Sequence, residues 1–359
     1  MSRTAFQRFM DSEVRSEDRH LRREMKRIRA MYRELYNEIA ECIRGLYDAY
    51  RASGSKESIY DWALAEGEYN HLIDTVEYIY RDRTERIEES IVLILMAVLS
   101  STYSHMTYAY EWIDGIPEQM QALPDSLVDL TIEGGQGAWT TYSADPGART
   151  FGDASLWIPK RRRLSEIVAA DRDRELTDLT SKVTSSLATG SGIRNTLKTV
   201  RRTISMVTRT TKPDGTTVTK VHGAAADATR VMRTEGNRLI NVGIMASAVG
   251  FYGLGTPKVR KEWVAILDTR TRQQSYEMDG QLVPLDGYFV YPNGATSQYP
   301  GQSGYPQYDI NDRCTSMVVL VSDEGQTVGF DPFFNDGDGV ESAFSWESYP
   351  DWEANPLYH

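Results

Sequence analysis

The residues best suited to chemistry lie in one short stretch, KEWVAILDTRTRQQSYEMDG, which covers residues 261–280. A strand-like run, WVAIL, ends directly before Asp268, and Arg270, Arg272 and Asp279 follow it. Carboxylate and guanidinium groups so close together could serve as general acids or bases and as oxyanion donors. No histidine stands among them. We expect instead that they pair with one another and hold the loop that follows the strand.

Two more charged residues, Arg233 and Glu235, lie in a stretch with the pattern of a helix. Residues two positions apart do not share a helix face, so each of them needs its own partner elsewhere. We expect Arg233 or Glu235 to reach the strand region and to pair with the charged groups there. The sequence thus predicts a structural charge network and no catalytic residue. The members of this network are Arg233, Glu235, Asp268, Arg270, Arg272 and Asp279.

Metal and cofactor motifs are not found in the sequence. The five histidines and two cysteines are scattered, without a C-x-x-C or H-E-x-x-H spacing. The oxygen-rich run DPFFNDGDGVE fails the register of an EF-hand loop. A Walker A motif, a Rossmann fingerprint and a G-x-S-x-G elbow are missing as well. We therefore expect no metal, no cofactor and no enzymatic activity.

A local reversal of charge covers residues 191–222, in a chain whose net charge is −11. The segment has a single acid, Asp214, and four of its cations recur at spacings that place them on one side of a short helix. We expect these four to contact DNA or an acidic partner surface. The alternative is that they pair with the protein's own acids, such as those from Asp323 onward. The four are Arg194, Lys198, Arg201 and Arg202.

The elements that must position these groups begin with helices. Apolar residues alternate at spacings of four and three along the first long helix, which is the stripe of a coiled-coil-like surface. Further helices are expected at 58–80 and 84–113, and either they or a partner protein would cover the stripe. The apolar run 91–99 is about half as long as a membrane span, so a buried helix is expected there. The stripe consists of Leu21, Met25, Ile28, Tyr32, Leu35, Ile39, Cys42 and Leu46.

The second half of the chain has the pattern of a mixed domain. A hairpin is expected around Pro213-Asp214-Gly215, a helix from His222 onward, and short strands after it. The fold class is therefore α+β, with a long N-terminal helical arm or bundle before a small α+β domain of short antiparallel strands. The expected strands are 263–267, 281–285, 288–291 and 316–322. The expected divisions are 1–115 (helical arm or bundle), 116–185 (loop-rich connector and helix), 186–321 (α+β domain) and 322–359 (acidic aromatic tail).

The order of these pieces resembles the Mu F-like minor head protein family of tailed bacteriophages, over roughly residues 185–321. The resemblance consists of RTEGNRLIN on a helix, KEWVAILDTRTRQQSYEMDGQ, DGYF, a Pro/Gly-rich loop and INDRC. The family often has His or Cys where Ser275 stands and a first Cys where Asp312 stands. A Cys/His metal cluster that some members could assemble therefore could not form in this chain.

The resemblance implies a virion protein at the portal vertex, or inside the capsid, that is made in the host cytoplasm. It implies roles in head assembly and in genome packaging or delivery. The implied partners are the portal protein and packaged double-stranded DNA, with the major capsid or scaffolding protein as further candidates and no membrane before infection. The alternative is an ADP-ribosyltransferase-like enzyme or toxin-related effector, because some relatives carry such domains.

Overall fold

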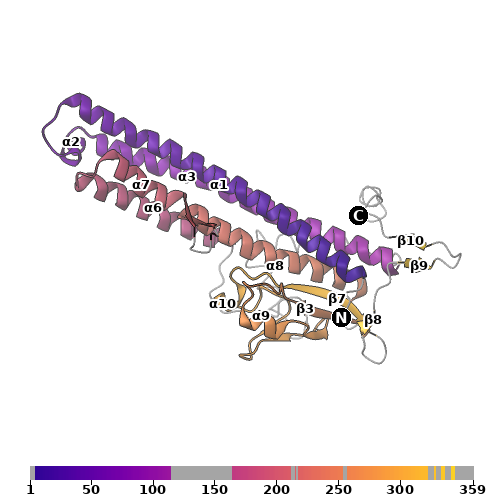
Figure 1. Ribbon diagram of the computed structural model, residues 1–359. Coiled ribbons are helices and arrows are strands. Elements are labelled where there is room, and N and C mark those ends of the chain that lie inside the picture. Colours follow the sequence, from indigo (N-terminus) through magenta and orange to yellow (C-terminus); the bar gives the residue numbers. More distant parts are fainter. Residues whose placement is uncertain are drawn as a thin grey trace. The chain divides into compact units, whose positions relative to one another are not determined.

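The structure, a computed structural model, confirms the α+β class (Figure 1). It describes residues 5–114, 164–211, 215, 217–253, 257–321, 327–328, 333–335 and 341–343. The chain forms two compact units. Unit 1 comprises Met1–Arg22, Ile94–Arg163 and Arg233–His359, and unit 2 comprises Arg23–Leu93 and Leu164–Met232. The division into four segments stays a prediction, and most of the expected connector and tail lies outside the described residues.

The helices are mostly long and the strands short. The helices are α1 (Ala5–Ser53), α2 (Ile59–Ala65), α3 (Glu68–Asp114), α6 (Leu164–Ala188), α7 (Ile193–Ile204), α8 (Ala224–Tyr252), α9 (Gln273–Met278) and α10 (Pro306–Asp309). The strands are β1 (Met206–Thr211), β2 (Thr217–His222), β3 (Val259–Val264), β4 (Leu282–Pro284), β5 (Phe289–Val290), β6 (Thr296–Ser297), β7 (Thr315–Val321), β8 (Thr327–Val328), β9 (Phe333–Asn335) and β10 (Glu341–Ala343).

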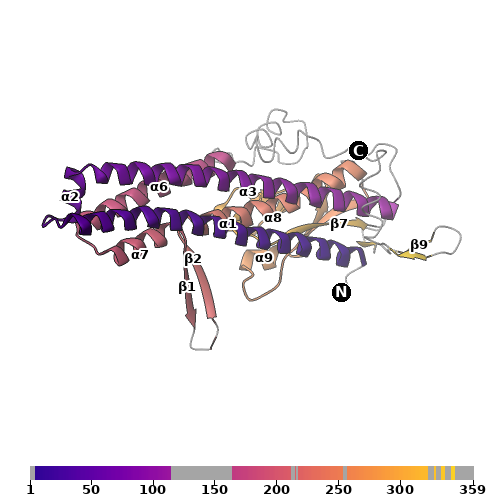
Figure 2. The same cartoon turned by 90° about the horizontal axis from the view of Figure 1, so that it is seen from above.

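The chain's own helices cover the apolar stripe of α1. Its members from Leu21 to Ile39 are all at most 6% exposed. Figures 1 and 2 both show α1 and α3 side by side. In unit 2, Arg83 donates two hydrogen bonds to Glu38, of 3.0 and 2.6 Å. In unit 1, the Ser101 hydroxyl donates to Glu17 over 2.7 Å. The stripe therefore makes a bundle within this chain, and a partner protein is not needed to cover it.

The helix expected at 58–80 is interrupted after Ala65, and α3 runs unbroken from Glu68 through the expected start of a third helix at 84. The chain turns instead at Gly67, whose φ of 76° favours glycine. Buried Ile87 and Ile91 continue the apolar face across the charged run that suggested a break. The stretch Glu68–Tyr110 is long and apolar enough to cross a membrane, but half of its most apolar window is buried inside the protein. The burial fits the buried helix expected at 91–99.

The sheet of unit 1 has the order β4-β3-β7-β8, and all its neighbours are antiparallel. The strand predicted at 263–267 lies earlier, at Val259–Val264. Its pairing ends where Val264 meets Thr315, the first residue of β7. The backbone N–H of Ala265 donates instead to Asp279 Oδ1 over 2.8 Å, so the next residues turn away from the sheet.

An aromatic cluster fills the core of this domain beside β3. Trp263 is 1% exposed and meets Phe289 edge to face, with ring centroids 5.1 Å apart. Tyr291, Met278 and Cys314 complete the cluster. On α8, the Asn241 side chain donates to the carbonyl oxygen of Cys314 over 3.1 Å, and its Oδ1 accepts from the N–H of Ser316 over 2.6 Å. These two bonds tie α8 to the start of β7.

One cation is buried in this apolar surrounding. Lys261 of β3 is 0% exposed, and its ammonium nitrogen lies 5.5 Å from the centroid of the Phe289 ring. No hydrogen-bond acceptor for this nitrogen is found among the described residues. Burial lowers the pKa of Lys261 to about 7, and the negative charge of Asp286 opposes that shift. Above about pH 7 the folded protein therefore favours the neutral amine.

We expect a pH-dependent stability that Lys261→Met removes. Between the lowered pKa and the usual value of about 10.4, the unfolded chain binds one proton more than the folded protein, so stability rises with pH. The free energy of unfolding should therefore rise by about 1–2 kcal/mol more in the wild type than in Lys261→Met from pH 7 to 8.5. Urea unfolding at several pH values measures it. Parallel curves for the two proteins would mean that Lys261 is charged in the folded state.

Candidate functional site

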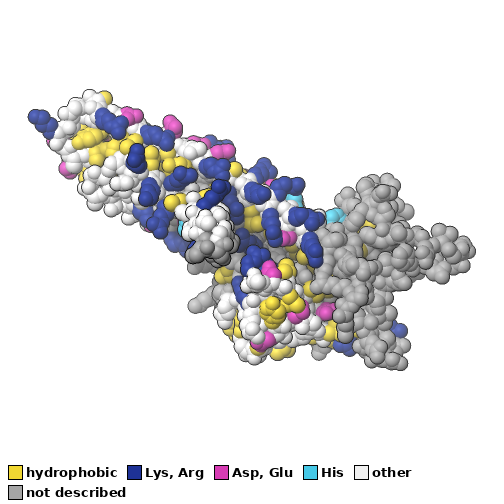
Figure 3. Space-filling model, viewed as in Figure 1, with side chains coloured by type: hydrophobic (Ala, Val, Ile, Leu, Met, Phe, Trp, Pro, Cys, Tyr) yellow, Lys and Arg dark blue, Asp and Glu magenta, His cyan; other side chains and the backbone are white. Residues whose placement is uncertain are grey.

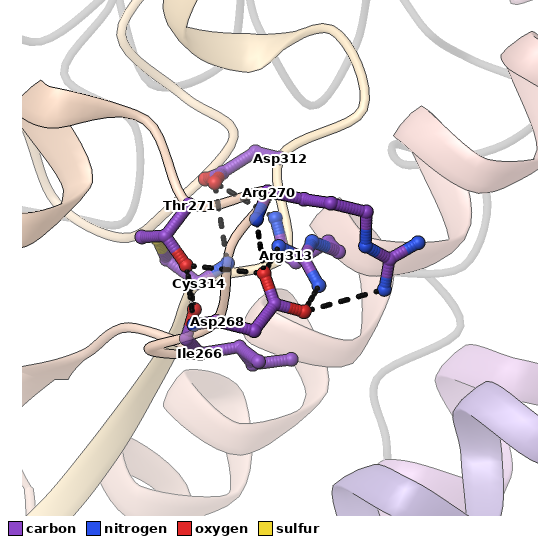
Figure 4. A network of polar contacts seen from close by, with 7 residues as sticks. All are labelled: Ile266, Asp268, Arg270, Thr271, Asp312, Arg313 and Cys314. Atoms are coloured by element: carbon purple, nitrogen blue, oxygen red, sulfur yellow. Dashed lines mark hydrogen bonds and ion pairs between the residues drawn. The ribbon is translucent and has the colours of Figure 1, made fainter. Parts of the chain in front are cut away.

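The charged stretch after β3 is organised around a pairing of Asp268 with Arg313 (Figure 4). The two guanidinium nitrogens of Arg313 each donate to one oxygen of Asp268, both over 2.7 Å. The backbone N–H of Arg270 adds a bond of 2.8 Å to Oδ1, and its guanidinium group approaches Oδ2 to 3.3 Å. A bidentate arginine–carboxylate pair fixes orientation as well as distance. The pair therefore joins the loop after β3 to the residue before Cys314 and β7.

These donors favour the charged form of the carboxylate. The hydrogen bonds from Arg313, followed by that from the Arg270 backbone, hold the pKa of Asp268 well below its usual range. The side chains of Asp268 and Arg313 are 35% and 23% exposed. A carboxylate so engaged is a weak base. We call the pair of Asp268 and Arg313 the clamp, because it joins two segments of the chain.

The other predicted members of the network have different partners. Arg233 donates to Asn311 Oδ1 over 2.9 Å, and Glu235 accepts from Arg238 over 2.6 Å. Arg272 donates to the backbone carbonyl groups of Gln307, Tyr308 and Ile310. The structure thus brings Asp268 and Arg270 together, and the partners described for Arg233 and Glu235 are Asn311 and Arg238.

Arg313 belongs to the motif INDRC, whose last four residues form the box Asn311–Cys314. Nothing in the sequence points to it as the main partner of Asp268. A single arginine 45 positions from Asp268 gives no sequence signal that the two side chains meet.

Next to this clamp, the positions where the family often has metal-binding residues lie together. The side chains of Ser275 and Asp312 lie within hydrogen-bonding range of the Cys314 thiol. Burial raises the pKa of Asp312 to about 6 and also raises the pKa of Cys314. Among the described residues, no group of three or more His, Cys, Asp and Glu side chains could hold a metal ion. The cavity beside them has about 20 Å³, which is room for one water molecule.

The four predicted contact residues lie on the exposed side of α7. Arg194, Lys198, Arg201 and Arg202 are all exposed, and Thr196, Val200, Thr203 and Ile204 are buried on the other side of the helix. The guanidinium carbon of Arg201 lies 5.8 Å from the ring centroid of Tyr36 on α1. Within the described part of the chain, none of the four forms an ion pair with a carboxylate. The residues from Asp323 onward, which could neutralise them, have no described side chains.

Beside α7, strands β1 and β2 form a two-stranded ribbon that extends away from the helices of unit 2 (Figure 2). Its base packs closely on the end of α7. A Cβ atom at Gly223 would lie 2.1 Å from the carbonyl oxygen of Thr203, and Gly223 has a φ of 77°. Only glycine fits there. The ribbon adds exposed Arg209 and Lys220 to the basic surface of α7.

Comparisons with known proteins give matches in the part of the chain that contains the α+β domain. Residues 177–317 match the family described as Phage Mu protein F like protein. This match confirms the resemblance to Mu F-like minor head proteins for a segment that contains Arg233, Asp268 and the box Asn311–Cys314.

Two individual relatives cover a similar share of the chain. The minor head protein GP7 of Bacillus phage SPP1 is 30% identical over 128 residues, which are 36% of this chain and 40% of that protein. The NAD(+)–arginine ADP-ribosyltransferase EFV of Enterococcus faecalis (strain ATCC 700802 / V583) is 28% identical over 130 residues, 36% of this chain and 25% of that protein. The chain thus spans less than half the length of either relative. No solved structure matches it significantly.

We expect that Asp268→Asn and Arg313→Gln each lower the melting temperature, and that the double variant loses less than the sum, because the two side chains share one interaction. The stabilising contribution of Asp268 is present above the usual carboxyl pKa of about 3.9 and is lost as the pH falls below it. The difference between wild type and Asp268→Asn should therefore shrink from pH 6 to pH 3.

Thermal unfolding followed by circular dichroism measures these effects. Arg270→Gln is the matched control, because the side chain of Arg270 is 72% exposed and its backbone N–H bond remains. Additive losses in the double variant would contradict the clamp.

Proposed function

We propose that this protein is a minor head protein of a tailed bacteriophage, located in the virion at the portal vertex, that assists head assembly and genome packaging or delivery. The observation that carries this proposal is the match of residues 177–317 to the Phage Mu protein F like family. The similarity to a phage minor head protein supports the same conclusion. The portal protein is the proposed docking partner, with the major capsid or scaffolding protein as further candidates.

The exposed side of α7 is the proposed contact with packaged double-stranded DNA. Arg194, Lys198, Arg201 and Arg202 give four exposed cations within about two and a half turns of helix. Like charges on one face repel one another unless an anion lies against them, and the phosphate backbone supplies closely spaced anions. The net charge of −11 disfavours DNA binding over the acidic parts of the surface. Contact with DNA would therefore be local.

An ADP-ribosyltransferase-like activity is the second candidate, because one relative carries that name. The match covers only a quarter of that relative. The one cluster of charged groups that looked catalytic is engaged in the clamp of Asp268 and Arg313, beside a cavity with room for one water. We propose that the chain is not an enzyme. Transfer of labelled ADP-ribose from NAD to arginine-containing acceptors would refute this.

We expect that the variant Arg194→Gln/Lys198→Gln/Arg201→Gln/Arg202→Gln allows heads to assemble but lowers the amount of DNA packaged or delivered. Binding of a duplex to the isolated protein should also lose salt dependence, by up to about 3.6 in the slope of log K against log salt, since each phosphate contact contributes about 0.9. DNA content per particle, infectivity and fluorescence anisotropy measure these effects.

A matched control removes four cations that already pair with carboxylates, as Arg44→Gln/Arg51→Gln/Arg81→Gln/Arg86→Gln. If the α7 variant loses stability while its DNA handling is unchanged, the four residues bind the protein's own acids instead. Imaging of particles made with and without this protein tests the proposed location at the portal vertex. Density that disappears from a site other than the portal vertex would contradict the proposed location.

A further inference from the structure

The solvent-facing side of α1 carries a second, longer row of cations. Its members are spaced alternately by four and three residues, so at about 100° per residue they fall within an arc of about 80°. At 1.5 Å per residue the row is about 27 Å long. Its members, called here the cationic row, are Arg15, Arg19, Arg22, Lys26, Arg29 and Arg33. Figure 3 shows Lys and Arg side chains gathered along α1.

Three members of the cationic row have no carboxylate partner among the described residues. Arg22 pairs with Asp18, and Arg29 donates to the hydroxyl of Thr229 over 3.3 Å. Arg19, Lys26 and Arg33 are exposed and form no ion pair with any carboxylate of the described residues. The apolar stripe of α1 is buried by the bundle, so these cations are among the side chains that α1 leaves exposed.

In unit 2, the end of the cationic row meets the basic side of α7. Tyr36 follows Arg33 by three residues, about one helical turn. The guanidinium group of Arg201 lies over the ring of Tyr36, with its central carbon 5.8 Å from the ring centroid. The cationic row thus ends about one helical turn from the residue of α1 that Arg201 contacts.

We propose that the cationic row of α1 binds the phosphate backbone of duplex DNA and extends the α7 contact along the helix. This inference rests on the proposed DNA contact of α7. A row of regularly spaced cations is suited to a regularly spaced line of phosphates. The cores of protein–protein interfaces, in contrast, are enriched in aromatic and other apolar side chains. On α1, the described residues from Val14 to Ser53 include no exposed large hydrophobic side chain. The surface therefore favours DNA over an acidic protein.

The test is the triple variant Arg19→Gln/Lys26→Gln/Arg33→Gln in the full chain. These side chains are exposed and form no ion pair with a described carboxylate, so the substitutions leave the bundle core intact. Its affinity for a 30-base-pair duplex is measured by fluorescence anisotropy from 25 to 150 mM NaCl. We expect the slope of log K against log salt to fall by about 2–3, because three phosphate contacts are lost at about 0.9 each.

The matched control is Arg23→Gln/Arg27→Gln/Arg86→Gln. It removes the same number of charges from exposed arginines that already pair with Glu24 and Asp82. We expect its salt slope to stay within about 1 of the wild-type value. Equal losses in the two triple variants would mean that only net charge matters, which overturns the proposal.

The α7 variant separates this inference from the proposed function. If the α7 variant loses binding while the triple variant on α1 does not, the α7 contact stands and the α1 contact is refuted. If neither variant changes the slope of log K against log salt, the α7 contact and the α1 contact with DNA are both refuted. If the α1 variant keeps its DNA slope but no longer co-sediments with purified portal protein, the row binds an acidic protein surface and DNA is the wrong partner.

Discussion

The structure depends first on the burial of one apolar stripe. A helix as long as α1 is stable in water mainly through the face it packs against other elements. The stripe from Leu21 to Ile39 runs through both compact units, and in each unit it is buried by the protein itself. Because that face is used internally, the side of α1 that stays exposed among its described residues is mostly charged. The packing that stabilises the bundle therefore also determines which side chains of α1 are exposed to solvent.

In the α+β domain, polar side chains bond to groups at the ends of the short strands. Its strands are short, and several connections run through loops rather than regular elements. The Asp268–Arg313 pair, the Asp279 contact with Ala265 and the Asn241 contacts with β7 each satisfy backbone or charged groups at a strand end. Strand ends leave such groups without ladder partners, and side chains that bond to them define where each strand stops. The groups that look catalytic in the sequence thus serve the fold.

Electrostatic asymmetry links the fold to the proposed role. The whole chain is acidic, but α7, the β1–β2 ribbon and one side of α1 carry exposed cations. An acidic surface repels DNA in general, and a few ordered cations allow contact at defined places. A protein that works beside a densely packed genome would need both properties, because a uniformly basic one would bind DNA everywhere.

The sequence by itself determined the fold class, the apolar stripe, the position of α7 and the resemblance to a phage head family. These features follow from the periodicity of apolar residues and from the order of short motifs. Both depend on residues that are close together in the sequence. Tertiary structure alone decided that the stripe is covered within the chain, that α3 is continuous, and that Arg313 pairs with Asp268. Such pairings depend on which distant residues meet once the chain has packed, and charge alone does not select one arginine among many.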